Sequence, residues 1–98
     1  MSMREYACID LTNTEPDEVI LLAHQIKDEE ISRVKQELMR ERERQGLTQR
    51  EVGETAGIKT PNVTRLEASD YAPSLVVLER YALALGKVIR LELVDAER

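Results

Sequence analysis

The sequence predicts a mainly α-helical domain with one short β-strand near each end. Between residues 16 and 86, apolar residues recur at helical spacing, and proline and glycine stand where helices would begin and end. Residues 4–11 and 87–94 instead alternate in the period of a strand. With 98 residues the chain can form one modest core, so an unpaired strand is expected to seek a partner.

The composition excludes several classes of protein. Hydrophobic residues make up 42% and charged residues 34%, and the only aromatics are three tyrosines, so Leu, Ile and Val must fill the core. No apolar run could span a bilayer, and no signal segment precedes the domain, which predicts a cytoplasmic protein without a membrane. One cysteine, Cys8, and one histidine, His24, give neither a disulfide framework nor the usual zinc ligands. We therefore expect no metal and no cofactor.

Charge divides the chain into three parts. The net charge is −5, but residues 1–30 carry eight acids and only two bases, whereas the remainder is close to neutral. We predict an acidic N-terminal arm (1–27) holding a short strand and a helix, a helical domain (28–86), and a C-terminal strand (87–98). Such asymmetry favours two surfaces with different partners.

Two helices are expected before the centre of the chain. The first covers residues 16–26, with Thr14 as N-cap. The second follows the acids at 28–30, which suit the positive end of a helix, and it closes before Gly46 as a left-handed cap.

The central segment predicts two short helices joined by a tight turn. Thr48 and Glu51 form a capping box, and Gly57 lies just beyond the end of the helix that they open, near residue 56. Thr60 is the expected N-cap of the next helix, with Pro61 at its first position and an end near residue 68. Two helices with a glycine-containing turn constitute a helix-turn-helix unit.

Core-type residues fall where such a unit must bury them. Gly53 lies at the expected close crossing of the helices, and the apolar contacts come from Val52, Ile58, Val63 and Leu66. A further helix opens at Pro73 and Ser74 and stops at Gly86. Its inward residues are predicted to be Leu75, Leu78, Tyr81, Ala82 and Leu85.

The segments LTQREVGETAGIKTPNVTRLE and PSLVVLERYALALG resemble the Cro/cI-type (XRE) family of helix-turn-helix regulators over roughly residues 33–86. The resemblance implies a five-helix-type, lambda-repressor-like domain. In place of a fifth helix, however, KVIRLELV reads as a strand. A terminal strand is similar to the HigA-type antitoxin subgroup, in which it would serve as a dimerisation element.

Seven residues are predicted to contact DNA. A recognition helix presents its N-terminal residues to base edges, where Asn62 can pair with adenine and Arg65 with guanine or a phosphate. Arg65 could equally be tied up by an acid of its own domain. The resemblance implies that Gln49 braces the DNA backbone. The full set is Gln49, Arg50, Lys59, Thr60, Asn62, Thr64 and Arg65.

Other charged residues receive structural interpretations. The resemblance implies that Glu67 makes an internal ion pair. The alternating charges of residues 40–44 indicate a solvent face, and Arg44 and Lys35 would add at most electrostatic attraction. His24 is expected at the surface, and Cys8 in the core rather than as a nucleophile.

These observations favour a DNA-binding transcriptional regulator, a repressor, acting as a dimer on double-stranded operator DNA. Residues 31–65 carry eight bases against five acids, which suits DNA. A refinement makes it a HigA-type antitoxin whose acidic arm binds a small basic toxin and which represses its own operon. The alternatives are a stand-alone or phage-derived regulator without a toxin, and an adaptor that binds protein instead of DNA. An enzyme is not expected, since the sequence contains no nucleophile–base pair or phosphate loop.

Overall fold

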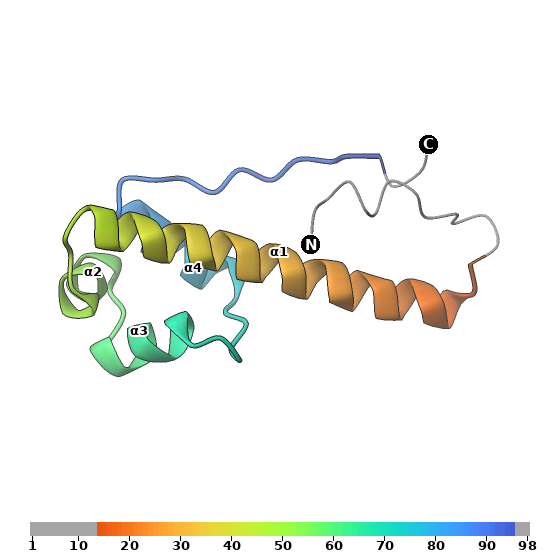
Figure 1. Ribbon diagram of the computed structural model, residues 1–98, viewed down its shortest axis with the longest axis horizontal. Helices are drawn as coiled ribbons and strands as arrows, with labels where there is room; N and C mark the ends of the chain where they lie inside the picture. The colour runs from red at the N-terminus through yellow and green to blue at the C-terminus, as the bar shows by residue number, and fades with distance from the viewer. Residues whose placement is uncertain (1–13, 96–98) are drawn as a thin grey trace. The chain divides into compact units, whose positions relative to one another are not determined.

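The computed structural model describes residues 14–95, which form four helices: α1 (Pro16–Arg44), α2 (Gln49–Ala56), α3 (Thr60–Glu67) and α4 (Leu75–Ala84) (Figure 1). The mainly helical prediction is confirmed. The compact unit that holds all of α2, α3 and α4 spans Glu30–Arg90, and the residues before and after it belong to a second unit. The strand predicted at 4–11, with Cys8, lies outside the described residues.

The α1 helix is continuous where the sequence analysis predicted two helices. It begins at Pro16 as expected, but it runs through the acids at 28–30 to Arg44. Those acids contain no helix breaker and are supported from within the helix, because the guanidinium of Arg33 bonds Glu30 at 3.0 Å and Glu37 at 2.6 Å. The expected left-handed cap follows at Gly46, with φ of +72°.

The α2 helix begins and ends as predicted. The Thr48 side chain accepts from the Glu51 N–H, and the Glu51 carboxylate accepts from the Thr48 N–H, which completes the capping box. Gly57 closes the helix in the left-handed conformation, with φ of 72°. Gly53 marks the close crossing, since a Cβ there would lie 2.4 Å from the backbone oxygen of Ile58. The sequence signals at this turn are therefore confirmed.

The start of α3 differs from the prediction by one residue. The N-cap is Lys59, without a side-chain cap, and Thr60 is the first helical residue. The Lys59 carbonyl already accepts from the N–H groups of Asn62 and Val63, so the turn closes one residue earlier than a Thr60 cap would allow. Pro61 tolerates this position because its missing N–H would have no partner in the first turn.

The α4 helix follows a short loop and carries the most buried side chains. Ser74 caps it by accepting from the Val77 N–H at 3.3 Å, and Gly86 with φ of +74° follows its end. Leu75 is 40% exposed, so its predicted inward position is wrong. It is the first residue of α4, and the buried residues of this helix begin at Leu78, one turn later.

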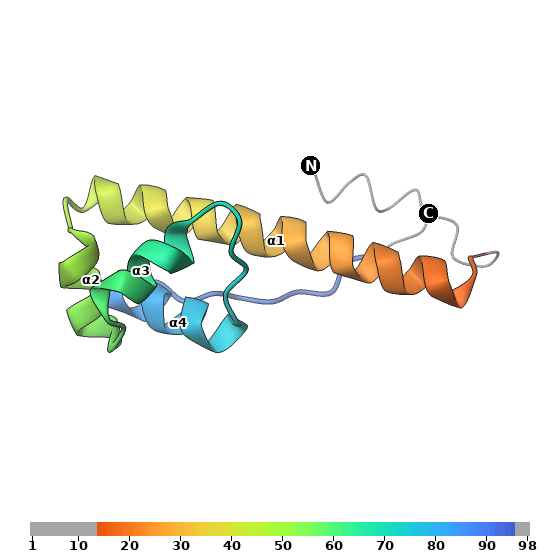
Figure 2. The ribbon, with the colours of Figure 1, turned by 90° about the horizontal axis from the view of Figure 1, so that it is seen from below.

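The core lies among the helices of the Glu30–Arg90 unit. Figure 1 and Figure 2 show α2, α3 and α4 gathered at the C-terminal end of α1, and α2 packs against both α3 and α4. The predicted contacts Val52, Val63 and Leu66 are buried, and Ile58 is partly buried against them. The buried set is Leu38, Val52, Val63, Leu66, Leu78, Tyr81, Ala82 and Leu85.

Residues 87–95 follow α4 in an extended conformation (Figure 1). Only Ile89 packs against the core, and its N–H donates to the Glu79 carboxylate at 3.1 Å. Leu91 and Leu93 are 71% and 103% exposed. Among residues 14–95 no fifth helix is present, and the strand predicted from residue 87 onward is not formed over 87–95. A strand needs a hydrogen-bonded neighbour, and no other strand is present in this described part of the chain.

Candidate nucleic-acid interface

The exposed side of α3 and the residue before it carry the predicted base-reading residues. Val63 and Leu66 face the core with exposures of 0% and 1%, and the helical period turns their neighbours outward. Those neighbours are polar or basic, and all are exposed: Lys59, Thr60, Asn62, Thr64 and Arg65. The structure therefore brings five of the seven predicted residues onto one accessible helix.

Gln49, predicted to brace a phosphate, links α2 to this helix. It is the first residue of α2 and is partly buried. Its Oε1 accepts from the Thr64 hydroxyl at 2.7 Å, and its Nε2 donates to the Glu67 carboxylate at 3.0 Å. The amide is thus held in one orientation at the N-terminus of α2, where a phosphate would meet both the helix dipole and a fixed polar side chain.

Glu67 is the centre of a buried network, and the internal ion pair expected of it is confirmed. Its Oε2 accepts from Arg42 Nε at 2.8 Å and from the Tyr81 hydroxyl at 2.6 Å. Its Oε1 accepts from Arg42 Nη2 at 3.0 Å, beside the bond from Gln49. The side chains of Arg42 and Glu67 are only 15% and 5% exposed. One carboxylate thereby joins α1, α2, α3 and α4.

The solvent-face interpretation of residues 40–44 is wrong for Arg42. This residue stands four positions after the buried Leu38, on the same side of α1, and so continues the core-facing stripe. That spacing was visible in the sequence and could have identified it. Arg44 matches the original interpretation, since it is exposed and paired with Glu41.

The network sets the charge states of its members. Burial by itself would raise the pKa of Glu67, but the hydrogen bonds from Arg42, Tyr81 and Gln49 outweigh it and lower that pKa below 4.5. Burial and the hydrogen bond donated to Glu67 raise the pKa of Tyr81. At neutral pH the carboxyl is therefore ionised and the phenol protonated, as the observed donor and acceptor roles require.

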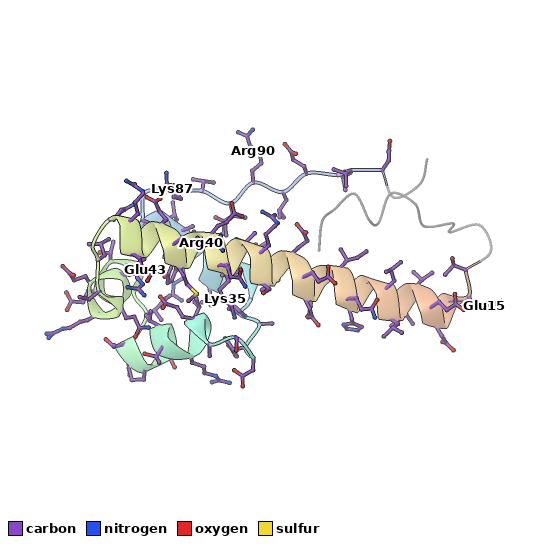
Figure 3. The ribbon with its side chains drawn as sticks, in the orientation of Figure 1. Glu15, Lys35, Arg40, Glu43, Lys87 and Arg90 are labelled. Carbon is purple, nitrogen blue, oxygen red and sulfur yellow. The ribbon has the colours of Figure 1, made fainter. Side chains whose placement is uncertain are left out.

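Lys35 does not supply the surface charge considered for it. Its exposure is 4%, and its ammonium donates to the carbonyl oxygens of Ala68 and Tyr71. Figure 3 shows it on the side of α1 that faces α3. Burial lowers the pKa of Lys35. Its role is to anchor the loop that follows α3.

The remaining predicted bases differ in their partners. Arg50 on α2 is exposed and paired with Glu54 at 3.1 Å. Arg65 is not held by an acid in the described residues; its guanidinium instead lies over the Tyr71 ring, 4.6 Å from the centroid. Tyr71 was not predicted to lie here, nor was Arg80, which lines the same pocket as Arg65. No periodic or motif signal in the sequence points to either residue.

Other kinds of site find no support in the described residues. No group of three or more His, Cys, Asp or Glu there could hold a metal ion. His24 is exposed, as predicted. No helix in the described range is long and apolar enough to cross a membrane.

Comparison with known proteins agrees with this geometry. Residues 38–88 match the helix-turn-helix family model HTH_3, which covers α2, α3, α4 and the end of α1. The chain therefore belongs to the helix-turn-helix family and is, at the level of that family, a DNA-binding transcriptional regulator; such proteins are typically not enzymes.

One curated relative is an uncharacterized HTH-type transcriptional regulator of Methanothermobacter thermautotrophicus. It is 41% identical over 51 residues, which cover 51% of this chain and 74% of the relative. No solved structure matches the chain.

Proposed function

We propose that this chain is a sequence-specific repressor that binds operator DNA as a dimer, with α3 in the major groove. The observation that carries the proposal is the exposed polar side of α3, tied through Thr64 to Gln49 at the N-terminus of α2. Helix-turn-helix proteins use these two elements for base edges and for the backbone, respectively.

The chemistry of the exposed residues assigns them roles. Asn62 can form two hydrogen bonds with adenine, and Arg65 can form two with guanine. Stacking on Tyr71 restricts the Arg65 guanidinium before DNA arrives, which lowers the entropic cost of ordering it. Gln49 and Arg50 would contact phosphates. Lys59, Thr60 and Thr64 complete the proposed docking surface.

Two substitutions separate these roles. Asn62→Ala should relax base preference at one or two operator positions, whereas Gln49→Ala should weaken specific and scrambled duplexes alike. Fluorescence anisotropy on an operator selected from random duplexes measures both effects. Gln36→Ala, an exposed amide on α1, is the matched control and should bind as the parent does. Parental binding by both site variants would show that the docking surface is assigned wrongly.

We propose that the C-terminal segment, 87–98, forms the dimer by pairing as a strand with its copy in a second chain. Support comes from the extended conformation of 87–95. Leu91 and Leu93 are also exposed, and they would lie on the same face of a strand because they are two residues apart. Replacing both leucines by lysine should shift the mass measured by light scattering toward the monomer. An unchanged mass would contradict strand pairing.

The antitoxin refinement concerns a second partner. The acidic first 30 residues suit a basic protein, and α1 opens with Asp17 and Glu18 beside three exposed apolar residues, Val19, Ile20 and Leu21. Co-expression with the protein encoded by the adjacent reading frame tests it. A basic partner that copurifies with the parent but not with an Ile20→Lys/Leu21→Lys variant supports an antitoxin, and its absence favours a stand-alone or phage-derived regulator.

The adaptor alternative makes the opposite prediction for DNA. An adaptor would bind no duplex even at low salt, where phosphate contacts are strongest. A gel shift of the parent chain at low ionic strength therefore distinguishes it from the proposed repressor.

A further inference from the structure

An open pocket of about 470 Å³ lies beside the base-reading helix, within the Glu30–Arg90 unit. It is lined by residues of α3, of the turn before it, of the loop after it and of α4. Three of the described lining residues are bases, Lys59, Arg65 and Arg80, and none is an acid. Asn62 adds an amide to the same wall.

The three bases of this pocket lack the carboxylate partner that several arginines of the described residues have. Arg33, Arg44 and Arg50 each pair with a carboxylate on their own helix. In the described residues, by contrast, no acid lies within ion-pair distance of the pocket bases. An anion in this pocket would therefore meet positive charge from three side chains that no carboxylate of the described residues neutralises.

Arg80 is held in place by the end of α2. Its Nε donates to the Ala56 carbonyl at 3.1 Å, and its Nη2 donates to the Gly57 carbonyl. These bonds use two of the five guanidinium N–H groups, so the other donors remain for a ligand. Gly57 permits the arrangement, because a Cβ there would lie 3.2 Å from Arg80 Nη2.

Arg65 is restrained by an aromatic ring. Its guanidinium lies 4.6 Å from the centroid of the Tyr71 ring, and a stacked guanidinium keeps the N–H groups at its edge available. Two restrained arginines, with a lysine that has no acidic partner in the described residues, offer the donors that a phosphate accepts, and arginine binds phosphate through two parallel hydrogen bonds.

We propose that this pocket binds a backbone phosphate of the operator, with Arg80 and Arg65 as its charged contacts. The inference rests on the proposed function, because Lys59, Asn62 and Arg65 belong to both the pocket and the docking surface. The pocket is open to solvent and larger than one phosphate, which suits a phosphate that belongs to a polymer. It adds Arg80 to the DNA contacts and would fix the register of α3 on the duplex.

The test measures operator affinity across a salt series. Arg80→Gln should weaken binding about tenfold or more, to operator and scrambled duplex alike, because a hydrogen-bonded charge is lost. It should also reduce the slope of log affinity against log salt by about 0.9, the value for one phosphate. Arg33→Gln removes the same charge from an exposed position on α1 and should leave the slope unchanged.

A second variant guards against loss of the fold, since Arg80 also bonds the end of α2. Arg80→Lys keeps the charge and should retain the parental slope, and thermal unfolding by circular dichroism confirms that each variant is folded. If Arg80→Gln does not fold, ethylation of single operator phosphates supplies the readout. Ethylation of one phosphate should weaken operator binding by the parent chain. The same ethylation should weaken binding by Arg80→Lys less, because lysine lacks the guanidinium fork.

The outcomes separate this inference from the proposed function. If the parent chain binds no duplex, the proposed function and the phosphate pocket are both wrong. If Asn62→Ala alters base preference while Arg80→Gln keeps the parental slope, only the phosphate pocket is wrong. The pocket could instead bind a free phosphate, and inorganic phosphate and a mononucleotide test this source. Their binding is followed in the amide NMR signals of Gly57 and Lys59. If either binds while Arg80→Gln keeps the parental salt slope for the operator, the pocket belongs to a free ligand and the proposal is overturned.

Discussion

Glu67→Gln is the substitution that best tests how this domain is held together. The two carboxylate oxygens of Glu67 accept four hydrogen bonds, two from Arg42 and one each from Tyr81 and Gln49. A glutamine keeps the shape but replaces one oxygen by an NH₂ donor. Whichever way the amide is turned, two of the four donors lose their acceptor, and Arg42 loses its counter-charge.

The cost follows from burial. Each buried donor left without a partner costs about 1–3 kcal/mol, and breaking a buried ion pair costs about 3–5 kcal/mol in all, so we expect a loss near 3 kcal/mol. For a domain of this size that loss lowers Tm by roughly 12–24 °C. Side-chain exposures of 5% and 15% for Glu67 and Arg42 leave little room for water to compensate.

Urea and thermal unfolding followed by circular dichroism at 222 nm measure the loss. The matched control is Glu54→Gln, which removes the same charge from an exposed pair with Arg50 and should change stability by about 0.5 kcal/mol or less. If Glu67→Gln were as stable as Glu54→Gln, the network would contribute no more than a surface pair, and the donors left by Glu67 would cost the fold nothing.

Two further predictions address the turn and the response to acid. Gly53→Ala should destabilise the fold by about 2 kcal/mol, because the strain of a Cβ placed 2.4 Å from the Ile58 oxygen exceeds the gain of about 1 kcal/mol in helix propensity; a urea midpoint at or above the parental value would contradict this. Tyr81→Phe should move acid unfolding to higher pH. The folded pKa of Glu67 lies below 4.5, so its stabilisation is present above pH 4.5 and lost as pH falls through the folded value. Removing the Tyr81 donor raises that folded value, and a parental acid midpoint in a circular dichroism titration would show that the Tyr81 bond does not stabilise the carboxylate.

The short helices of this chain could be predicted because their signals are local. Thr48 and Glu51 close a capping box within three residues, and Gly57 takes a backbone conformation that few other residues adopt. Such signals need no knowledge of the rest of the molecule. The predicted start of α3 is wrong by one residue. Thr60 suits an N-cap and also the first turn of a helix, and Pro61 is tolerated in either case.

The continuity of α1 could not be read in the same way. An acidic run is compatible with a helix start and equally with a helix interior, and the choice depends on pairs such as Arg33 with Glu30 and Glu37. The burial of Lys35 is also a tertiary effect, since its partners are carbonyl oxygens 33 and 36 residues away. Its spacing from Ile31 and Leu38 places it on the core-facing side of α1, but the sequence does not show which carbonyl oxygens it would bond.

The exposure of the candidate DNA contacts on α3 could be predicted from the sequence, but the residues that support them could not. Asn62 and Arg65 follow from their place on a recognition helix, whereas the ring beneath Arg65 comes from Tyr71 in the next loop. Lys35 holds that loop through the Tyr71 carbonyl. The buried Lys35 therefore holds the loop whose ring supports Arg65, the arginine for which we propose base contacts.

The same relation holds at the other end of the interface. Gln49 is oriented by Glu67, whose charge is balanced by Arg42 and whose second oxygen is held by Tyr81 in the core. A free glutamine side chain would have to give up rotamer entropy on meeting a phosphate, whereas this one has already done so in the folded protein. Because the bonds that order the side chain are also the bonds that join the four helices, a substitution that loosens Gln49 from within the network must weaken the fold as well. If Gln49 contacts the DNA backbone as we propose, stability and backbone recognition are coupled through the carboxylate of Glu67.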